Sequence, residues 1–140
     1  MQTFLPYRSF AMSAIALDKQ RLGKQRVEAY QILRALNGQS KGWVNHPATK
    51  MWRGYERALR QYLRAMILEW VDRGYKNTMD IPAEDPDAPM PPWLGDPRLH
   101  TSHRANLRRK DPVHYGYSED PTTPYFWPSE QEEYNAQLAA

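Results

Sequence analysis

Residues 21–31 place one carboxylate among several cations, a combination that can act chemically on a polyanion. If this stretch is helical, at about 100° per residue, Arg21, Lys24 and Glu28 fall within roughly 80° of one another. Its apolar residues fall on a different face, as a core stripe would. We therefore predict that Glu28 is the chemical centre and that Arg21, Lys24 and Arg26 bind DNA. A salt-bridged surface patch is the alternative explanation.

A second group of cations follows between residues 53 and 64. Arg53, Arg57, Arg60 and Arg64 fall within about 60° on one side of a predicted helix, opposite a wide apolar face. Four arginines in line favour contact with DNA phosphates, so we add all four to the predicted DNA-binding residues. A solvated face, partly screened by Glu56, is the alternative.

The four histidines of the sequence do not form a recognisable metal motif. No carboxylate lies at the HExxH spacing and the chain has no Cys, so we predict neither a metal nor a cofactor. Phosphate-binding motifs of the GxxxxGK[ST] and GxGxxG types are also absent, which argues against nucleotide-triphosphate chemistry. The predicted DNA-binding residues also include His46, near a helix start, and His103, on the apolar edge of a predicted helix, although a structural role for both histidines stays open. They further include Arg104, which belongs to a second basic cluster with Arg108, Arg109 and Lys110.

Charge is distributed unevenly along the 140 residues, whose net charge is +3. Residues 1–78 carry 14 Lys and Arg against 5 Asp and Glu, whereas residues 79–140 carry 5 against 11. Such asymmetry suggests that the first half faces a polyanion, although a simple partition of solvated surface gives the same counts. The N-terminus lacks the features of a signal peptide, and no apolar run approaches the ~20 residues of a membrane span. We expect one cytoplasmic, monomeric domain over residues 1–140 with no membrane contact.

These residues must be positioned by helices, and the sequence predicts an all-α domain with three main helices. The expected elements are an N-terminal arm at 3–7, a short helix from 9 to about 17, a main helix from 18 to about 36, a loop with an exposed Trp43, a second helix from 46 to about 73, a proline-rich acidic loop to 96, and a third helix to about 109, capped by Asp96 or Thr101. Gly23 inside the main helix costs up to ~1 kcal/mol, so either the helix tolerates it or another group approaches the backbone there.

The C-terminal part is aromatic and rich in proline. Tyrosine, phenylalanine and tryptophan at 115–127 either close a core between helices or stack on unstacked bases. Residues 129–140 are expected to be a frayed tail.

The order of these features resembles that of the pyrimidine-dimer DNA glycosylase/AP lyase family, whose members are the phage endonuclease V-like enzymes. A short arm precedes a helix that carries Arg21 and, seven residues later, Glu28. The second helix ends in the basic-Gly-aromatic turn at 73–77, and an aromatic segment at 114–117 follows the third helix. The sequence departs from the family pattern at Arg21, where the family has His.

This resemblance implies a compact helical domain that binds duplex DNA containing a damaged, abasic or modified nucleotide and flips that nucleotide out of the helix. In the family the free N-terminal amine attacks C1′, a Schiff base forms, a glutamate matching Glu28 is required, and β-elimination cuts the strand. The bulk of Gln2 disfavours removal of Met1, so Met1 is the expected nucleophile, with Lys24 or Lys19 as alternatives. An α-amine suits this role because its usual pKa of about 8 is below the value of about 10.4 for Lys.

The expected function is therefore that of a DNA repair glycosylase with AP-lyase activity on damaged or modified pyrimidines. Two alternatives stay open at this point. One is a glycosylase for a hypermodified base, and the other is a non-catalytic DNA-binding protein, for which the same basic surface would suffice.

Overall fold

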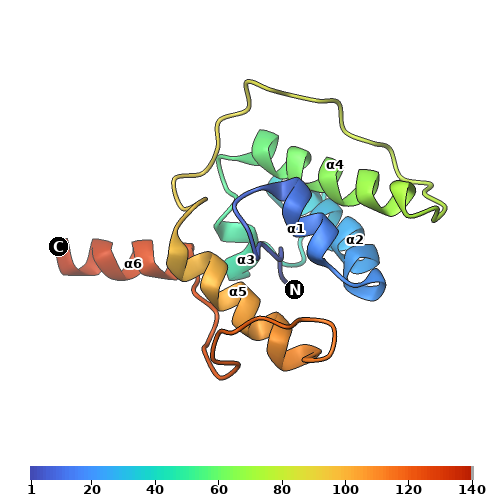
Figure 1. Ribbon diagram of the computed structural model, residues 1–140. Coiled ribbons are helices and arrows are strands. Elements are labelled where there is room, and N and C mark those ends of the chain that lie inside the picture. Colours follow the sequence, from blue (N-terminus) through green and yellow to red (C-terminus); the bar gives the residue numbers. More distant parts are fainter. Residues whose placement is uncertain (140) are drawn as a thin grey trace.

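All the regular elements of the computed structural model are helices (Figure 1). The structure describes residues 1–139, and in that range no strand occurs. The helices are, in chain order, α1 (Phe10–Ala16), α2 (Lys19–Leu36), α3 (Pro47–Lys50), α4 (Glu56–Asp72), α5 (Pro97–Lys110) and α6 (Pro128–Ala139). The predicted all-α fold class is confirmed.

Polar side chains cap the N-termini of three of these helices, at the positions where the sequence predicts that the helices begin. Ser9 accepts a hydrogen bond from the N–H three residues later at 3.1 Å, and Asp18 does the same at 3.4 Å. Of the two caps considered for α5, the structure selects Asp96, which accepts from the N–H two residues later at 2.9 Å; Thr101 lies within the helix. Each cap satisfies a donor that the first helical turn leaves unpaired.

The helix pair α2 and α4 forms the centre of the fold, with α1 packed on α4. Leu22 and Ile32 from α2 and Leu59 and Met66 from α4 are fully buried between them. These residues recur at helical spacing, so the apolar stripes read from the sequence do face the core. None of the helices within residues 1–139 has the length and apolar character that crossing a membrane requires.

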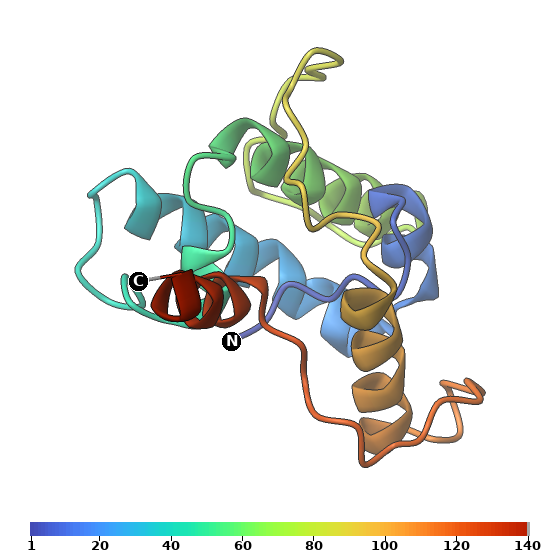
Figure 2. The ribbon, with the colours of Figure 1, turned by 90° about the vertical axis from the view of Figure 1, so that its left-hand side faces the viewer.

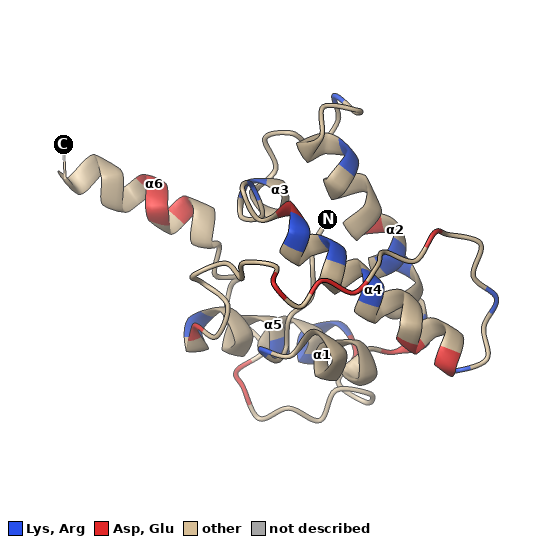
Figure 3. Cartoon of the chain, turned by 90° about the horizontal axis from the view of Figure 1, so that it is seen from above, with Lys and Arg blue, Asp and Glu red and all other residues tan. Residues whose placement is uncertain are grey.

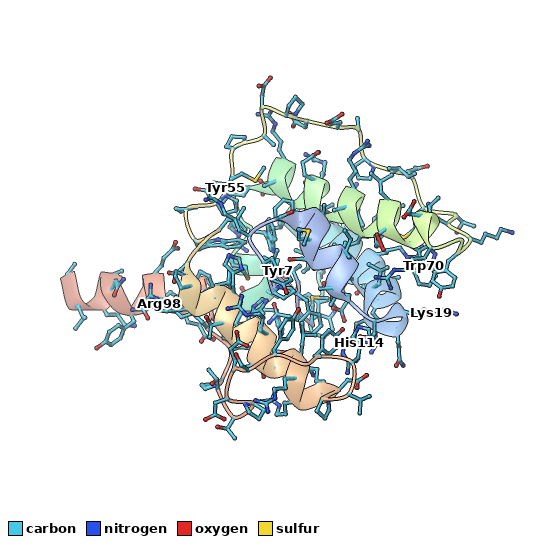
Figure 4. The ribbon with its side chains drawn as sticks, viewed as in Figure 1. Tyr7, Lys19, Tyr55, Trp70, Arg98 and His114 are labelled. Atoms are coloured by element: carbon cyan, nitrogen blue, oxygen red, sulfur yellow. The ribbon has the colours of Figure 1, made fainter. Side chains whose placement is uncertain are left out.

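Gly23 lets α2 approach α4 closely. A β-carbon at this position would lie 3.0 Å from a ring carbon of Trp70, which is tighter than ordinary contact. Tyr75 packs on Trp70 with ring centroids 4.6 Å apart, and the Lys19 ammonium lies 4.5 Å from the Tyr75 ring centre. Figure 4 shows Trp70 and Lys19 at the same end of this helix pair. Of the two explanations for Gly23, close approach of another group is the correct one.

The single helix predicted for residues 46–73 is wrong, because the chain forms α3 and α4 with a turn between them. Gly54 in that turn has a φ of 86°, a left-handed conformation that ends helical geometry and that glycine adopts without steric cost. The turn buries Trp52 completely and aims its indole N–H at Thr3, whose Oγ1 accepts at 3.0 Å. This buried hydrogen bond connects the turn to the N-terminal arm.

The C-terminal segment is helical where the sequence predicts fraying. Helix α6 extends away from the other helices (Figure 1) and is seen nearly end-on in Figure 2, and most of its side chains are exposed. It is anchored at its first residues, Pro128 and Ser129, which are buried next to α3. Ala140, the last residue of the expected frayed segment, lies outside the described residues.

Candidate active site

A cavity of about 340 Å³ lies beside the start of the chain. The lining residues that concern the chemistry are Met1 and Gln2 from the arm, Arg21, Lys24 and Glu28 from α2, and Lys110 from the end of α5. The two residues expected to be catalytic, Met1 and Glu28, therefore share one cavity with cations.

The Glu28 carboxylate is hydrogen-bonded to the backbone of the arm. Its Oε2 accepts from the N–H of Gln2 at 3.3 Å and from the side-chain amide of Gln25 at 3.1 Å. Three covalent bonds separate the α-nitrogen of Met1 from the nitrogen of Gln2, so these atoms are at most about 4 Å apart. The terminal amine consequently lies within about 8 Å of the carboxylate.

Side chains from the helix pair hold the arm in this position. Gln25 accepts at its Oε1 from the N–H of Phe4 at 3.0 Å and from the Tyr62 hydroxyl at 2.7 Å. The Tyr62 hydroxyl also lies 2.8 Å from the carbonyl oxygen of Phe4, and burial raises its pKa well above the usual value. Because Gln25 bonds Glu28 through its other side-chain atom, one buried residue connects the arm to the carboxylate.

Two histidines of α5 bind the backbone of the next arm residue. The His103 Nδ1 accepts from the N–H of Leu5 at 2.8 Å, and the His100 Nδ1 lies 2.8 Å from the carbonyl oxygen of Leu5. The His100 Nε2 accepts from the N–H of Gly95 at 2.9 Å. Both rings are therefore neutral, and burial lowers the pKa of His100 and lowers that of His103 to about 3.

The prediction that His103 binds DNA is wrong, because its side chain is fully buried. Its role is to position the arm. The sequence placed His103 on a helix but carried no local signal that its partner is Leu5, which lies 98 residues away.

Three cations surround the opening of the cavity. Lys24 is exposed, and Arg21 is half-buried and pairs with Asp18 at 3.1 Å. Partial burial lowers the pKa of Lys110, and the positive charges of Arg21, Arg109 and Lys24 act in the same direction. Sequence reasoning assigned Lys110 to a basic cluster on α5 but not to this site.

The Arg26 side chain does not line the cavity and instead contacts residues at and after the end of α4. Its guanidinium lies 4.2 Å from the centre of the Trp70 ring, and its Nη1 donates to the side-chain oxygen of Asn77 at 2.9 Å. Burial lowers its pKa. Of the three cations predicted around Glu28, only Arg21 and Lys24 line the cavity.

Two arginines of the predicted stripe bind the chain's own acidic loop. Arg57 makes two hydrogen bonds to the carboxylate of Asp85, at 2.8 and 2.9 Å, and Arg64 donates to the carbonyl of Pro82 at 2.8 Å. Figure 3 shows the acidic residues of this loop passing over the basic residues of α4. Arg60 stays exposed, and no residue of α4 is among those that line the cavity.

The first arginine of the predicted stripe and the first arginine of the second basic cluster also make internal contacts. Arg53 lies in the turn before α4 and donates to the carbonyl of Val44 at 3.2 Å. Arg104 donates to the carbonyl of Pro6 at 2.8 Å and pairs with Glu119. Arg104 thus connects α5 to the arm and to the C-terminal segment.

His46 is the last residue of the loop before α3. Its Nδ1 accepts from the N–H of Ala48 at 3.0 Å, which caps α3 and leaves the proton of the neutral ring on Nε2. Partial burial lowers the pKa of His46, the charge of the terminal amine lowers it further, and Glu28 opposes this. His46 is therefore within electrostatic range of both residues expected to be catalytic.

Within residues 1–139, no three His, Cys, Asp or Glu residues are grouped as a metal site would require. The arrangement instead offers an amine, a carboxylate and several cations around an open cavity. That set can bind an anionic sugar-phosphate and attack an electrophilic carbon.

A family model described as pyrimidine dimer DNA glycosylase matches residues 1–83, a range that includes the arm, Glu28 and the whole of α4. No curated protein and no solved structure matches the chain.

Proposed function

The chain belongs to the pyrimidine dimer DNA glycosylase family, and from that premise we propose a DNA repair glycosylase that is also an AP lyase. Its substrate is a damaged or modified pyrimidine in duplex DNA, and its nucleophile is the α-amine of Met1. One observation carries the proposal, namely the hydrogen bond from the N–H of Gln2 to Glu28, which holds the terminal amine beside a carboxylate.

The protein groups that react all line the cavity. The lone pair of the Met1 amine forms a bond to C1′ while the bond from C1′ to the base breaks. The base leaves with the electrons of the broken bond and takes up the proton that the attacking nitrogen loses. The sugar ring then opens, its ring oxygen takes a proton from water, and a protonated imine results. Loss of a proton from C2′ then breaks the C3′–O bond and releases the 3′ phosphate, which cuts the strand.

Glu28 has two tasks in this scheme. A carboxylate offsets positive charge that develops on the sugar, as in glycoside cleavage, and it can accept a proton during elimination. Its position on α2 is fixed by Gln25, so the arm and the carboxylate keep their spacing without substrate.

The cations at the cavity rim bind the phosphates on either side of the reacting nucleotide. Arg21, Lys24 and Lys110 come from two helices and face one opening, which suits a backbone that enters from outside. Extrusion of the nucleotide costs a few kcal/mol and is cheapest at damaged sites, which favours damaged over normal DNA.

Borohydride trapping tests the imine directly. The protein is incubated with duplex DNA that contains an abasic site, the imine is reduced, and the adduct is digested with trypsin. The peptide Met1–Arg8 contains no lysine, so a sugar on that peptide identifies the α-amine as the nucleophile. An adduct on a peptide that contains Lys24 or Lys110 would assign the nucleophile to a side chain, and the absence of any adduct would refute the imine mechanism.

A matched pair of variants tests Glu28. Glu28→Gln should bind abasic DNA nearly as well as the wild type while strand cleavage falls by two or more orders of magnitude, as for loss of a group that acts in general acid–base catalysis. The control is Glu84→Gln, an exposed carboxylate on the acidic loop, which should cleave normally. Parallel loss of binding and cleavage in Glu28→Gln would assign this residue to affinity instead. A panel of ultraviolet-damaged, abasic and base-modified duplexes then identifies the lesion.

A further inference from the structure

Trp43 has an unusual backbone conformation for its residue type. It lies in the loop between α2 and α3 with a φ of 66°, and among residues 1–139 it alone has a positive φ without being glycine. Left-handed conformations of bulky residues are strained and persist where surrounding contacts impose them, commonly at binding sites. The side chain gains little burial in exchange, because half of its surface is exposed.

Three further rings connect Trp43 to the cavity. Ring centroids are 5.5 Å apart between Trp43 and His46, 5.9 Å between His46 and Trp127, and 5.7 Å between Trp127 and Tyr125. Tyr125 lines the cavity that contains Met1. We name these four rings the aromatic row. It begins at an exposed indole and ends at the reacting groups.

Cations accompany the exposed end of the aromatic row. A hollow of about 150 Å³ beside Trp43 is lined by Arg34 from the end of α2, and Lys41 in the same loop is exposed. Rings that bind bases, next to cations that bind phosphates, are the combination by which proteins hold unpaired nucleotides. A protein partner would not need this arrangement of charge.

We propose that Trp43 is a base-stacking residue, which binds a nucleobase unstacked from the duplex when the neighbouring damaged nucleotide enters the cavity. This inference rests on the proposed function, because it assumes that DNA reaches the cavity. The aromatic row connects the two places. A strand bound at Tyr125 can continue past Trp127 and His46 to the exposed indole of Trp43. The strained loop then serves to present the indole to the DNA.

Binding to a duplex with a tetrahydrofuran site tests the inference without any imine, because this abasic analogue has no reactive C1′. A 2-aminopurine placed beside the analogue reports stacking by quenching of its fluorescence. Trp43→Ala should weaken binding to this duplex by about 5- to 150-fold, as expected from ~1–3 kcal/mol for one stacked base. It should also abolish the quenching, and Trp43→Phe should retain most of both. Binding to undamaged duplex should stay unchanged.

Two further variants separate stacking from folding. Tyr30→Ala is the control, because Tyr30 is similarly exposed but lies about 200° from Glu28 around α2, and it should bind normally. Trp43→Gly relieves the left-handed strain, so its melting temperature should equal or exceed that of the wild type while its binding is as weak as that of Trp43→Ala.

Normal affinity and normal quenching in Trp43→Ala would overturn the proposal. If the wild type forms a trapped imine while Trp43→Ala binds normally, the stacking inference fails and the proposed function stands. If no imine forms but Trp43→Ala still loses affinity for the abasic analogue, stacking stands and the lyase chemistry fails.

Discussion

Acidification should lower the free energy of unfolding through His103, the buried ring that binds the backbone of the N-terminal arm. The His103 Nδ1 accepts from the N–H of Leu5, so protonation would remove the acceptor and place a charge in the core. Burial lowers the pKa of this ring to about 3, against about 6.5 in an unfolded chain. Below pH 6.5 the unfolded state therefore binds a proton that the folded state does not, and the free energy of unfolding falls as the pH falls.

The size of this effect follows from the two pKa values. Each pH unit between 6.5 and about 3 costs about 1.4 kcal/mol for one such group, so lowering the pH from 7.5 to 5.0 removes about 2 kcal/mol through His103 alone. His100 adds to the loss, because burial lowers its pKa as well. The measurement stops at pH 5.0 so that carboxylates do not add to the change. Those with a lowered pKa, such as Asp18, lose their contribution to folding stability only as the pH approaches about 4.

Urea unfolding at pH 7.5 and 5.0 measures the effect. His103→Asn retains an acceptor near the position of Nδ1 but does not titrate, so its stability should fall by about 2 kcal/mol less than that of the wild type over the same range. His103→Leu also lacks the titration, and it should be less stable at both pH values because the N–H of Leu5 loses its partner, at a cost of about 1–3 kcal/mol. Equal pH dependence in the wild type and His103→Asn would refute the assignment of a neutral, buried His103.

Two further substitutions test the packing around the site. Gly23→Ala should lower the free energy of unfolding by roughly 1 kcal/mol in thermal or urea unfolding, because the strain of placing a methyl group 3.0 Å from Trp70 exceeds the gain in helix propensity; a more stable variant would show that Trp70 moves aside freely. Gln25→Leu should cost about 1–3 kcal/mol by removing the acceptor of the Phe4 N–H and the Tyr62 hydroxyl, and should slow imine trapping at saturating DNA. Normal trapping by a folded Gln25→Leu protein would mean that the arm does not need this anchor.

Much of the fold could be predicted because local chemistry sets it. Ser9, Asp18 and Asp96 cap helices with their own side chains, and each cap involves residues no more than three apart. The face that carries Glu28 and Lys24 follows from the helical repeat alone. Family membership was also readable from the order of motifs in the sequence, and the family match over residues 1–83 confirms that membership.

The break between α3 and α4 depended on contacts that the sequence does not display. Apolar periodicity continues through Trp52 and Tyr55, so the local pattern favoured one helix. The indole of Trp52 has its partner in Thr3, 49 residues away, and only the folded chain brings them together. For the same reason Asp85 could not be recognised as the partner of Arg57, which the sequence pattern presented as an unpaired cation.

The sequence by itself determined α1, α2 and α5, the caps of these helices and the carboxylate on α2. Tertiary structure alone decided where the N-terminus goes, because the arm forms no regular element and its backbone is bound by side chains of α2 and α5. The hydrogen bonds of Gln25 to Phe4 and of His103 to Leu5 span 21 and 98 residues. Those long-range bonds bring the terminal amine to Glu28, and they also bring Lys110 to the same cavity.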